Sequence, residues 1–267
     1  FQHKDGEYRW QLSRAVPQKD ENGKIQMWVG TSTDIDEIKK HEQQKDDFIK
    51  MASHELKTPV TTIKGYVQLL LKMHGAGNDA FLSSSLLTID KQVGKLTKLI
   101  TDLLDLTKIE TGSLNLNNER FNLAGNVKEI VCDLQTTIQT HRIILLELAD
   151  GYVHGDKDRI SQVINNLITN AIKYSPGANS ILVELCEKDS NLVVSVQDFG
   201  IGIAQQEQHK IFERFYRVAG KDEKTFPGFG IGLFIVNEII SKHNGKVWVE
   251  SEKDKGSKFY ISLPRVF

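Results

Sequence analysis

Residues 48–60 read Phe-Ile-Lys-Met-Ala-Ser-His-Glu-Leu-Lys-Thr-Pro-Val, and the interpretation of the whole chain depends on this stretch. Apolar residues recur at alternating spacings of four and three, which predicts an amphipathic helix packed against a partner helix. These positions are Phe48, Ala52, Leu56, Pro59, Ile63, Tyr66 and Leu70. At about 100° per residue, His54 lies about 200° from both Ala52 and Leu56, so its imidazole should face solvent.

The surroundings of His54 favour a reactive side chain, with a solvated surface histidine as the simpler alternative. Glu55 places a carboxylate beside the imidazole, and Thr58 lies one helical turn further along the same face. Pro59 removes a backbone hydrogen bond and crowds the carbonyl group of Glu55, so we expect a bend or a loosened turn there. The stretch therefore contains a candidate nucleophile whose reaction partner must come from elsewhere in the chain.

The composition indicates an ordinary globular chain. The 267 residues suffice for two or three domains, with 39% hydrophobic and 26% charged residues. A net charge of -1 without a basic cluster gives no reason to expect a nucleic-acid partner. Cys132 and Cys186 lie far apart among apolar neighbours, which predicts reduced core residues and a cytosolic location.

No signal peptide and no run of about 20 apolar residues occurs in the sequence. The chain begins at Phe1 in the middle of a strand-like pattern. We therefore interpret it as the cytoplasmic portion of a longer protein, whose membrane anchor, if it has one, lies outside this stretch.

Residues 1–35 alternate in the manner of β-strands. The runs 8–16 and 26–32 flank a polar turn that contains Gly23. Two or three strands cannot bury a core by themselves, so we expect the end of a larger sheet domain. The pattern resembles the closing hairpin of a PAS sensor domain, which ends in Asp34-Ile35 before a signalling helix. An unrelated hairpin is the alternative.

Residues 36–114 predict two long helices. The first runs from about 36 to 73, residues 74–79 break it, and the second ends near Ile109. A short loop between long helices gives an antiparallel hairpin. The apolar positions of the second helix are Leu82, Leu86, Ile89, Val93, Leu96, Ile100 and Leu103. Two helices cover these stripes only in part, so we expect a homodimer that closes a four-helix bundle; packing of the hairpin against another domain is the alternative.

Residues 115–267 alternate between helices and strands, which predicts a separate α/β sandwich domain. Asp156 should cap a helix that ends at Tyr174, before Ser-Pro-Gly. The fold class is therefore α+β and multidomain, with boundaries at 1–35, 36–114 and 115–267.

Two polar motifs of this domain suit nucleotide chemistry. Asn166, Asn170 and Lys173 share one helix face, where amide oxygens suit Mg²⁺ and a lysine adds charge against phosphates. Asp198-Phe199-Gly200-Ile201-Gly202 follows a strand, and its carboxylate can accept a hydrogen bond from an amino group such as that of adenine. An exposed polar helix face and a plain strand-to-helix turn are the structural alternatives.

Residues 227–233 read Pro-Gly-Phe-Gly-Ile-Gly-Leu and lead into a helix over 234–242. Backbone N–H groups of such a loop form an anion site, although the spacing is neither that of a P-loop nor that of a dinucleotide fold. The aromatic stretch 211–217 and the polar residues 218–226 predict a lid over a ligand, with Arg217 able to reach a phosphate.

The chain from about residue 45 to 264 resembles the sensor histidine kinases of two-component signalling. The motifs occur in the family's order: the phospho-acceptor box at 48–59, the N box at 166–173, the G1 box at 198–202, the F box at 212–215 and the G2 box at 228–232. The resemblance implies a dimerisation and phosphotransfer hairpin, followed by an ATP-binding domain of the Hsp90, gyrase and MutL type. No motif residue departs from the pattern.

The resemblance also implies roles for individual residues. His54 would be the nucleophile, Glu55 its base and Thr58 a phosphatase residue, with the phosphoryl group passing to an aspartate of a response regulator. Asn166, Lys173 and Arg217 would complete the catalytic set. Mg²⁺ would bind Asn170, assisted by Asn166. The implied ATP-binding set is Asn166, Asn170, Lys173, Tyr174, Asp198, Gly200, Gly202, Ile203, Phe215, Arg217, Gly228, Gly230, Ile231, Gly232 and Leu233.

Two functions from other classes stay open at this point. An ATP-gated conformational module would hydrolyse ATP without forming a phosphoprotein, and a dimerising scaffold would bind no nucleotide.

Overall fold

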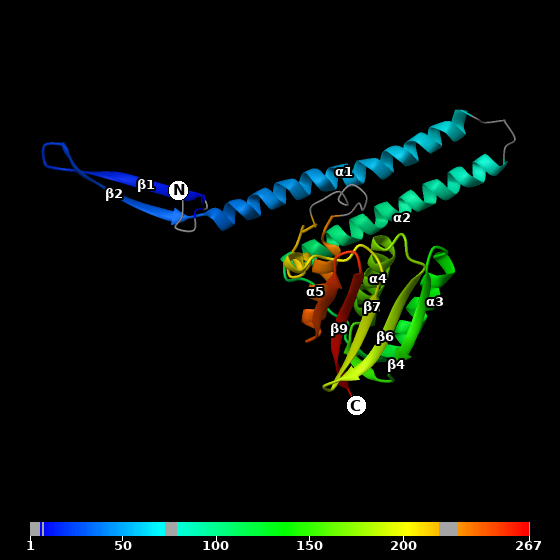
Figure 1. Ribbon diagram of the computed structural model, residues 1–267. Helices are drawn as coiled ribbons and strands as arrows, with labels where there is room; N and C mark the ends of the chain where they lie inside the picture. Colours follow the sequence, from blue (N-terminus) through cyan, green and yellow to red (C-terminus); the bar gives the residue numbers. More distant parts are fainter. Residues whose placement is uncertain (1–5, 7, 73–78, 219–228, 267) are drawn as a thin grey trace. The chain divides into compact units, whose positions relative to one another are not determined.

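The computed structural model describes residues 6, 8–72, 79–218 and 229–266 (Figure 1). It divides into two compact units, Phe1–His54 and Glu55–Phe267, and helix α1 runs through the boundary. The backbone of His54 is helical, but its side chain is not among the described parts of the structure. The expected exposure of its imidazole therefore stays a prediction.

The first unit contains a β-hairpin, as the alternating pattern predicted. Strands β1 (Gln11–Lys19) and β2 (Ile25–Asp34) pair in antiparallel fashion. The Oδ1 atom of Asp20 accepts the backbone N–H groups of Asn22 and Lys24 at 3.0 and 2.9 Å, which closes the turn. Every residue of β2 is exposed. Within the described residues this hairpin has no hydrophobic core, as expected of two strands alone.

The first residue of helix α1 (Asp36–Lys72) makes several polar contacts. The carboxylate of Asp36 accepts the backbone N–H of Trp10 at 3.2 Å and lies 2.8 Å from the Nζ atom of Lys40. The lysine and the backbone hydrogen bond lower the pKa of Asp36. Further along, Pro59 is buried and α1 continues on both sides of it, so the expected bend stays a prediction.

The apolar positions of helix α2 (Asp79–Glu110) fall into two sets, one partly buried at heptad spacing and one exposed. Ile89, Leu96 and Leu103 are partly buried. Exposed are Leu82 (45%), Leu86 (52%), Val93 (45%) and Ile100 (46%). One set is therefore covered within the chain and the other is not. No helix among the described residues combines the length and the apolarity that a membrane span requires.

The rest of the second unit is a seven-stranded mixed sheet with the order β3-β5-β9-β7-β6-β4, in which β8 also pairs with β9. Only β4 and β6 run parallel. The strands are β3 (Glu119–Asn122), β4 (Arg142–Leu148), β5 (Tyr152–Gly155), β6 (Ser180–Lys188), β7 (Asn191–Gln197), β8 (Lys246–Glu252) and β9 (Gly256–Val266).

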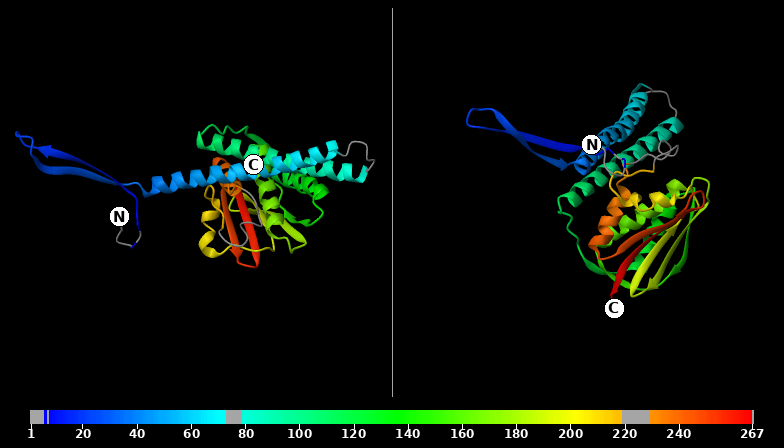
Figure 2. Two further views of the ribbon diagram at one scale, coloured as in Figure 1. Left: turned by 90° about the horizontal axis from the view of Figure 1, so that it is seen from above. Right: turned by 60° about the vertical axis from the view of Figure 1, so that its left-hand side comes forward.

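Three helices cover one face of this sheet: α3 (Leu123–Thr137), α4 (Lys157–Tyr174) and α5 (Gly232–Lys242) (Figures 1 and 2). Two short 3₁₀ turns, Gln205–Glu207 and Lys210–Phe212, precede α5. The helices bury a continuous apolar core that includes Ile164, Ile168, Leu185, Ile235 and Ile239, none more than 1% exposed. The predicted α/β sandwich is confirmed, although α5 begins at Gly232, two residues earlier than expected.

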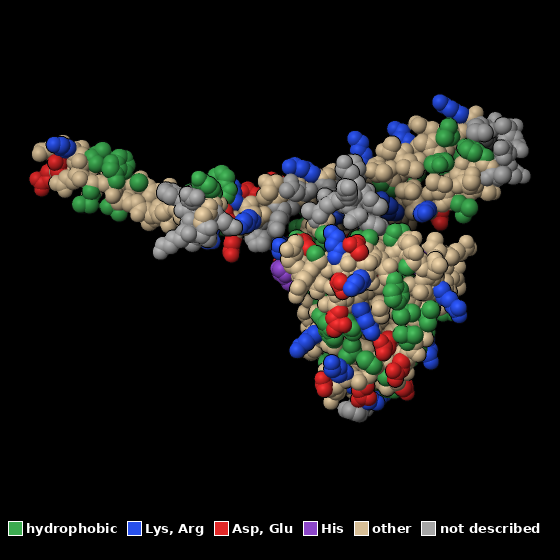
Figure 3. All heavy atoms as spheres, viewed as in Figure 1, with side chains coloured by type: hydrophobic (Ala, Val, Ile, Leu, Met, Phe, Trp, Pro, Cys, Tyr) green, Lys and Arg blue, Asp and Glu red, His purple; other side chains and the backbone are tan. Residues whose placement is uncertain are grey.

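The other face of the sheet carries charges of both signs. Figure 3 shows acidic and basic side chains interspersed over the sheet unit. Lys258 on β9 and Glu184 on β6, for example, form an ion pair of 3.0 Å over the strand β7 between them.

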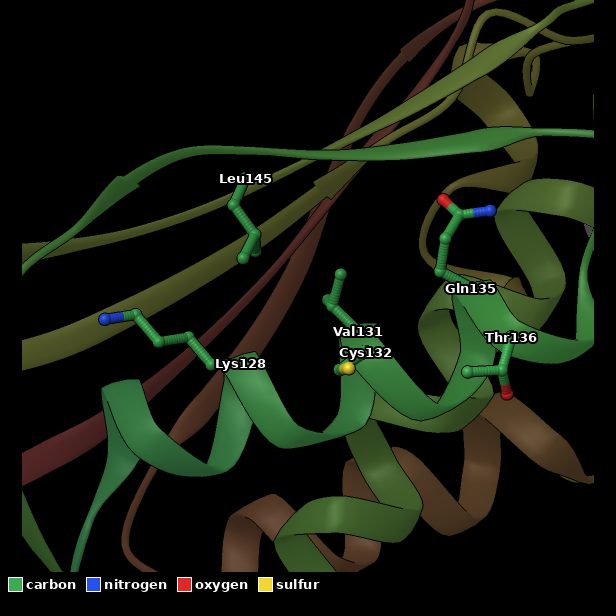
Figure 4. Close-up of a pocket in the computed structure, with 6 residues that line it drawn as sticks. All are labelled: Lys128, Val131, Cys132, Gln135, Thr136 and Leu145. Carbon is green, nitrogen blue, oxygen red and sulfur yellow. The ribbon is translucent and has the colours of Figure 1, made fainter.

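The prediction that Cys132 is a core residue is wrong. Cys132 is an exposed free cysteine, whereas Val131 beside it is 6% exposed. Consecutive helix residues point about 100° apart, so a buried neighbour in the sequence does not place a residue on the buried face. Cys186 is also free and is partly buried on β6. The hollow in Figure 4, between α3 and β4, is lined by Lys128, Val131, Cys132, Gln135, Thr136 and Leu145, and holds none of the predicted site residues.

Candidate active site

Helix α4 presents the predicted asparagines side by side. Asp156 caps the helix as expected, because its Oδ1 atom accepts the backbone N–H of Arg159 at 3.0 Å. The Nδ2 group of Asn166 donates to the carbonyl oxygen of Gly232 at 2.9 Å, and the Nδ2 group of Asn170 donates to Oδ1 of Asn166 at 3.2 Å. Both ends of the Asn166 amide are thus used within the protein. Among the described residues, only the nitrogen of the Asn170 amide is used, so its oxygen is available to a ligand.

The last turn of α4 places Lys173 among other cations. Its Nζ atom lies 4.9 Å from the centre of the Tyr174 ring. Burial, followed by the charges of Arg217 and Lys98, lowers the pKa of Lys173 to about 8. Burial also raises the pKa of Tyr174. A partly buried group of like charges is unfavourable by itself and is relieved by a bound anion.

Asp198 follows β7 and is 3% exposed. Its Oδ1 atom accepts the backbone N–H groups of Gly200 at 2.9 Å and Ser257 at 3.2 Å. Burial raises the pKa of Asp198, and the two hydrogen bonds oppose that rise. Among the described residues no hydrogen bond uses Oδ2, so this oxygen can accept a hydrogen bond from a ligand.

The loop after Asp198 lies directly on the end of α4. A Cβ atom at Gly200 would lie 2.0 Å from the carbonyl oxygen of Tyr174, and the N–H of Ile201 donates to that oxygen at 3.2 Å. Gly200 is therefore required by close contact with backbone. Beyond Gly202, the N–H of Ile203 donates to Oγ of Ser251 at 2.8 Å, which fixes the loop against β8.

The aromatic segment and the second glycine loop meet at Gly230. This residue has φ of +68°, and a Cβ atom there would lie 2.7 Å from the carbonyl oxygen of Tyr216. Phe215 also has positive φ, +65°, which is uncommon for an aromatic residue. Ile231 is 1% exposed and leads into α5 at Gly232 and Leu233. Gly228 and most of the expected lid, residues 219–226, lie outside the described residues.

Glu55 on α1 belongs to the same compact unit as this site. Its Oε2 atom lies 3.5 Å from Nζ of Lys95 on α2 and accepts no hydrogen bond from the described residues, although it is buried. The charge of Glu55 raises the pKa of Lys173, against the larger lowering effects, and Lys95 lowers it. Thr58, one turn beyond His54, is exposed.

The structure thus brings together the predicted residues of α4, the Asp198 loop, Arg217 and Gly230–Leu233, with Glu55 nearby. The sequence interpretation missed Lys95 and Lys98 on α2, which occupy ordinary polar positions between apolar heptads and belong to no motif.

The donor set fits a magnesium ion shared with phosphates. Among the described residues, no cluster of three or more His, Cys, Asp or Glu side chains is suited to hold a metal ion. The amide oxygen of Asn170 is a hard donor of the kind Mg²⁺ accepts, and Mg²⁺ takes much of its coordination from water and phosphate.

Two family descriptions match the chain. Residues 44–112 match the His Kinase A (phospho-acceptor) domain, and residues 155–266 match the Histidine kinase-, DNA gyrase B-, and HSP90-like ATPase family. The first match contains His54, Glu55 and Thr58, and the second contains the four candidate nucleotide-binding segments.

Curated proteins similar to the chain include two sensor kinases. The sensor histidine kinase WalK of Bacillus subtilis (strain 168) is 32% identical over 249 residues, which cover 91% of this chain and 40% of WalK. The sensor protein kinase WalK of Staphylococcus aureus is 29% identical over 248 residues, covering 91% of this chain and 59% of that protein. The chain therefore spans 40% of the length of the first relative and 59% of the second.

Solved structures with a similar fold include the Acinetobacter baumannii histidine kinase AdeS. Its TM-score is 0.60 at 27% identity, over 79% of this chain and 97% of that one. Histidine kinase ThkA in complex with the response regulator protein TrrA has a TM-score of 0.57 at 24% identity, over 95% of this chain and 75% of that one, and shows the fold alone.

Proposed function

We propose, from the premise that the chain belongs to the sensor histidine kinases of two-component signalling, that it transfers the γ-phosphoryl group of ATP to His54 and then to an aspartate of a response regulator. One observation carries this proposal. The loop after Asp198 lies against the end of α4, the helix that carries Asn170 and Lys173, in a compact unit that also contains Glu55, the residue after His54.

The ATP-binding roles follow from the chemistry of each group. The Oδ2 atom of Asp198 accepts a hydrogen bond from the amino group of adenine, since Oδ1 already accepts hydrogen bonds from two backbone N–H groups. Backbone N–H groups at the start of α5, from Gly230 to Leu233, bind phosphate oxygens. Lys173 and Arg217 offset the phosphate charge. The Asn170 oxygen would hold Mg²⁺, with Asn166 assisting by accepting the Asn170 amide N–H, and the ion would further neutralise that charge.

The transfer step uses the neutral imidazole of His54 as the nucleophile. A ring nitrogen forms a bond to the γ-phosphorus while the bond to the β–γ bridging oxygen breaks, so that ADP leaves. Glu55 accepts or orients the proton of the other ring nitrogen. The buried Oε2 atom of Glu55, without a hydrogen bond from the described residues, supports this role. In a separate phosphatase activity, Thr58 positions a water that attacks the phosphoryl group on the aspartate of the regulator, so that inorganic phosphate leaves and the carboxylate is restored.

The direct test is labelling with γ-labelled ATP and Mg²⁺. We expect acid-labile label on the wild-type chain and none on His54→Ala. His154→Ala is the matched control, because His154 is an exposed histidine on β5 and is none of the predicted site residues. Label that survives in His54→Ala would refute the assignment of the nucleophile, and ATP hydrolysis without any phosphoprotein would favour a conformational ATPase.

The same proposal covers assembly and boundaries. Residues 1–35 are the end of a PAS-like sensor domain, 36–114 the signalling helix with the phosphotransfer hairpin, and 115–267 the ATP-binding domain.

The exposed apolar set of α2 supports a homodimer, since a second copy would cover it in a four-helix bundle. Sedimentation equilibrium measures the mass, and a monomer at micromolar concentration would contradict this assembly. Phosphotransfer to a panel of receiver domains tests the regulator as partner.

Lys173 makes ATP binding depend on pH. With a pKa of about 8, lowered by burial and neighbouring cations, this side chain loses its charge between pH 7 and 9 in the free protein. Because phosphate favours the protonated form, affinity for an ATP analogue should fall about tenfold over that interval. Titration calorimetry at several pH values measures it. Lys173→Met should bind weakly with a flat profile, and a wild-type profile in that variant would contradict the role.

A further inference from the structure

Asp105 forms a buried polar joint between α2 and α4. It is 3% exposed. The Nη1 group of Arg159 donates to both carboxylate oxygens at 2.9 Å, and Nε2 of Gln162 donates to Oδ2 at 2.7 Å. The same Nη1 group also donates to Oε1 of Gln162 at 2.8 Å. A carboxylate held by three hydrogen bonds in a buried position fixes the two helices relative to each other.

The chain that connects α2 to the sheet strengthens this joint. The backbone N–H of Asn117 donates to Oδ2 of Asp156 at 2.9 Å, and Asp156 is the residue that caps α4. Nζ of Lys242, at the end of α5, donates to the carbonyl oxygen of Leu114 at 3.0 Å. Leu114 itself is 4% exposed. The connection after α2 is thus fixed to the start of one helix and the end of another.

The joint and the candidate nucleotide site share one face of α4. Arg159, Gln162, Asn166, Asn170 and Lys173 follow at spacings of three, four, four and three. At a rise of 1.5 Å per residue, Asn170 lies about 12 Å along the axis from Gln162. A contact that fixes Arg159 and Gln162 therefore also fixes the rotation of α4 and the direction in which Asn170 faces.

The residues of α2 that lie toward α4 also share one helix face. Lys95, Lys98, Asp102 and Asp105 recur at spacings of three, four and three, and Lys95 lies about 15 Å from Asp105. Because Asp105 is fixed to the start of α4, Lys95 and Lys98 lie opposite the C-terminal end of α4. The contact of Lys95 with Glu55 at 3.5 Å and the effect of both lysines on Lys173 agree with that register.

We propose that Asp105, Arg159 and Gln162 act as a positioning joint that aligns the nucleotide face of α4 with the Glu55–Lys95 side of the hairpin. The proposal rests on the proposed function. None of the three residues contacts ATP in this assignment. They act through α4, so that a loosened joint misaligns the phosphoryl donor without weakening its binding. A misplacement of about 1 Å at a reacting group can cost about 100-fold in rate.

The kinetic test is Asp105→Asn, which keeps the side-chain shape and removes the charge. We expect the kcat of His54 phosphorylation to fall about 10- to 100-fold while the KM for ATP and the Kd of an ATP analogue stay within twofold. Glu110→Gln is the matched control, because Glu110 is also on α2 but its 3.0 Å ion pair with Arg214 joins side chains that are 46% and 38% exposed. It should change kcat less than twofold. An Asp105→Asn variant with a raised KM, or with wild-type kcat, overturns the proposal.

A second measurement does not depend on activity. Nitroxide labels at the exposed residues Thr97 on α2 and Lys188 on β6, in a Cys132→Ser/Cys186→Ser background, report the distance between the two elements. The distribution of distances should be narrow in the parent protein and broader in Asp105→Asn. An unchanged distribution overturns the joint, whether or not the wild-type chain phosphorylates His54. If γ-labelled ATP does not label His54 of the wild-type chain, the proposed function is refuted, and this result is independent of the distance measurement. If Asp105→Asn does not fold, Gln162→Met, which removes only the 2.7 Å bond, is used for the same two readouts.

Discussion

Replacement of Asn170 by alanine is expected to lower the rate of His54 phosphorylation by about 100-fold or more, with little change in the unfolding temperature. The amide oxygen of Asn170 is the hard donor that remains available at the site, since Asn166 uses both ends of its own amide within the protein. Loss of a group that only supports a metal ligand already costs about 10- to 100-fold in affinity or activity, and loss of the ligand itself also removes charge neutralisation at the phosphates.

Asn165→Ala is the matched control for this variant. Asn165 precedes Asn166 on the same helix and is partly buried, but its Nδ2 group donates to the carbonyl oxygen of Ser161 at 3.0 Å. Initial rates with γ-labelled ATP over a range of Mg²⁺ concentrations measure both variants. If Asn170→Ala reaches the wild-type rate at high Mg²⁺ with no shift in the Mg²⁺ dependence, Asn170 is not a ligand.

Gly200→Ala should weaken the binding of an ATP analogue about 100-fold. A Cβ atom at this position would lie 2.0 Å from the carbonyl oxygen of Tyr174 and 2.8 Å from Cα of Ser175, and backbone atoms cannot rotate away. The loop has to move off α4, and the hydrogen bond from the Gly200 N–H to Oδ1 of Asp198 moves with it. We also expect a loss of about 1–3 kcal/mol in the free energy of unfolding.

Gly177→Ala provides the comparison, because nothing lies within 4 Å of a Cβ atom there and the residue is exposed. Titration calorimetry gives the affinity, and thermal unfolding gives the stability. Unaltered affinity in Gly200→Ala would show that the loop tolerates the displacement and that Asp198 does not depend on it for its position.

Much of the fold could be predicted because it depends on local patterns. The helical period gave α1 to within one residue of its end, and the capping role of Asp156 followed from residue type and position. The location of Cys132 could not be predicted in this way. Its neighbours indicate an apolar surrounding, but only the rotation of α3 on the sheet decides which of two consecutive residues is buried.

The candidate site, too, could be predicted from the sequence only in part. Motif spacing identified Asn166 and Asn170, yet the use of the Asn166 amide depends on the carbonyl group of Gly232, which only the approach of α5 to α4 provides. Asp105 and Arg159 are separated by 54 residues, and neither belongs to a glycine-rich or catalytic pattern. Their contact is a property of the packed helices, so it required the structure.

The first turn of α1 also has a mechanical consequence. Asp36 accepts the backbone N–H of Trp10, which precedes β1, and its own N–H donates to Oδ1 of Asp34, the last residue of β2. Both strands of the hairpin are therefore attached to one residue at the start of the helix. These two hydrogen bonds couple the strand pair to that first turn, so we expect a twist of the strands to rotate the start of the helix.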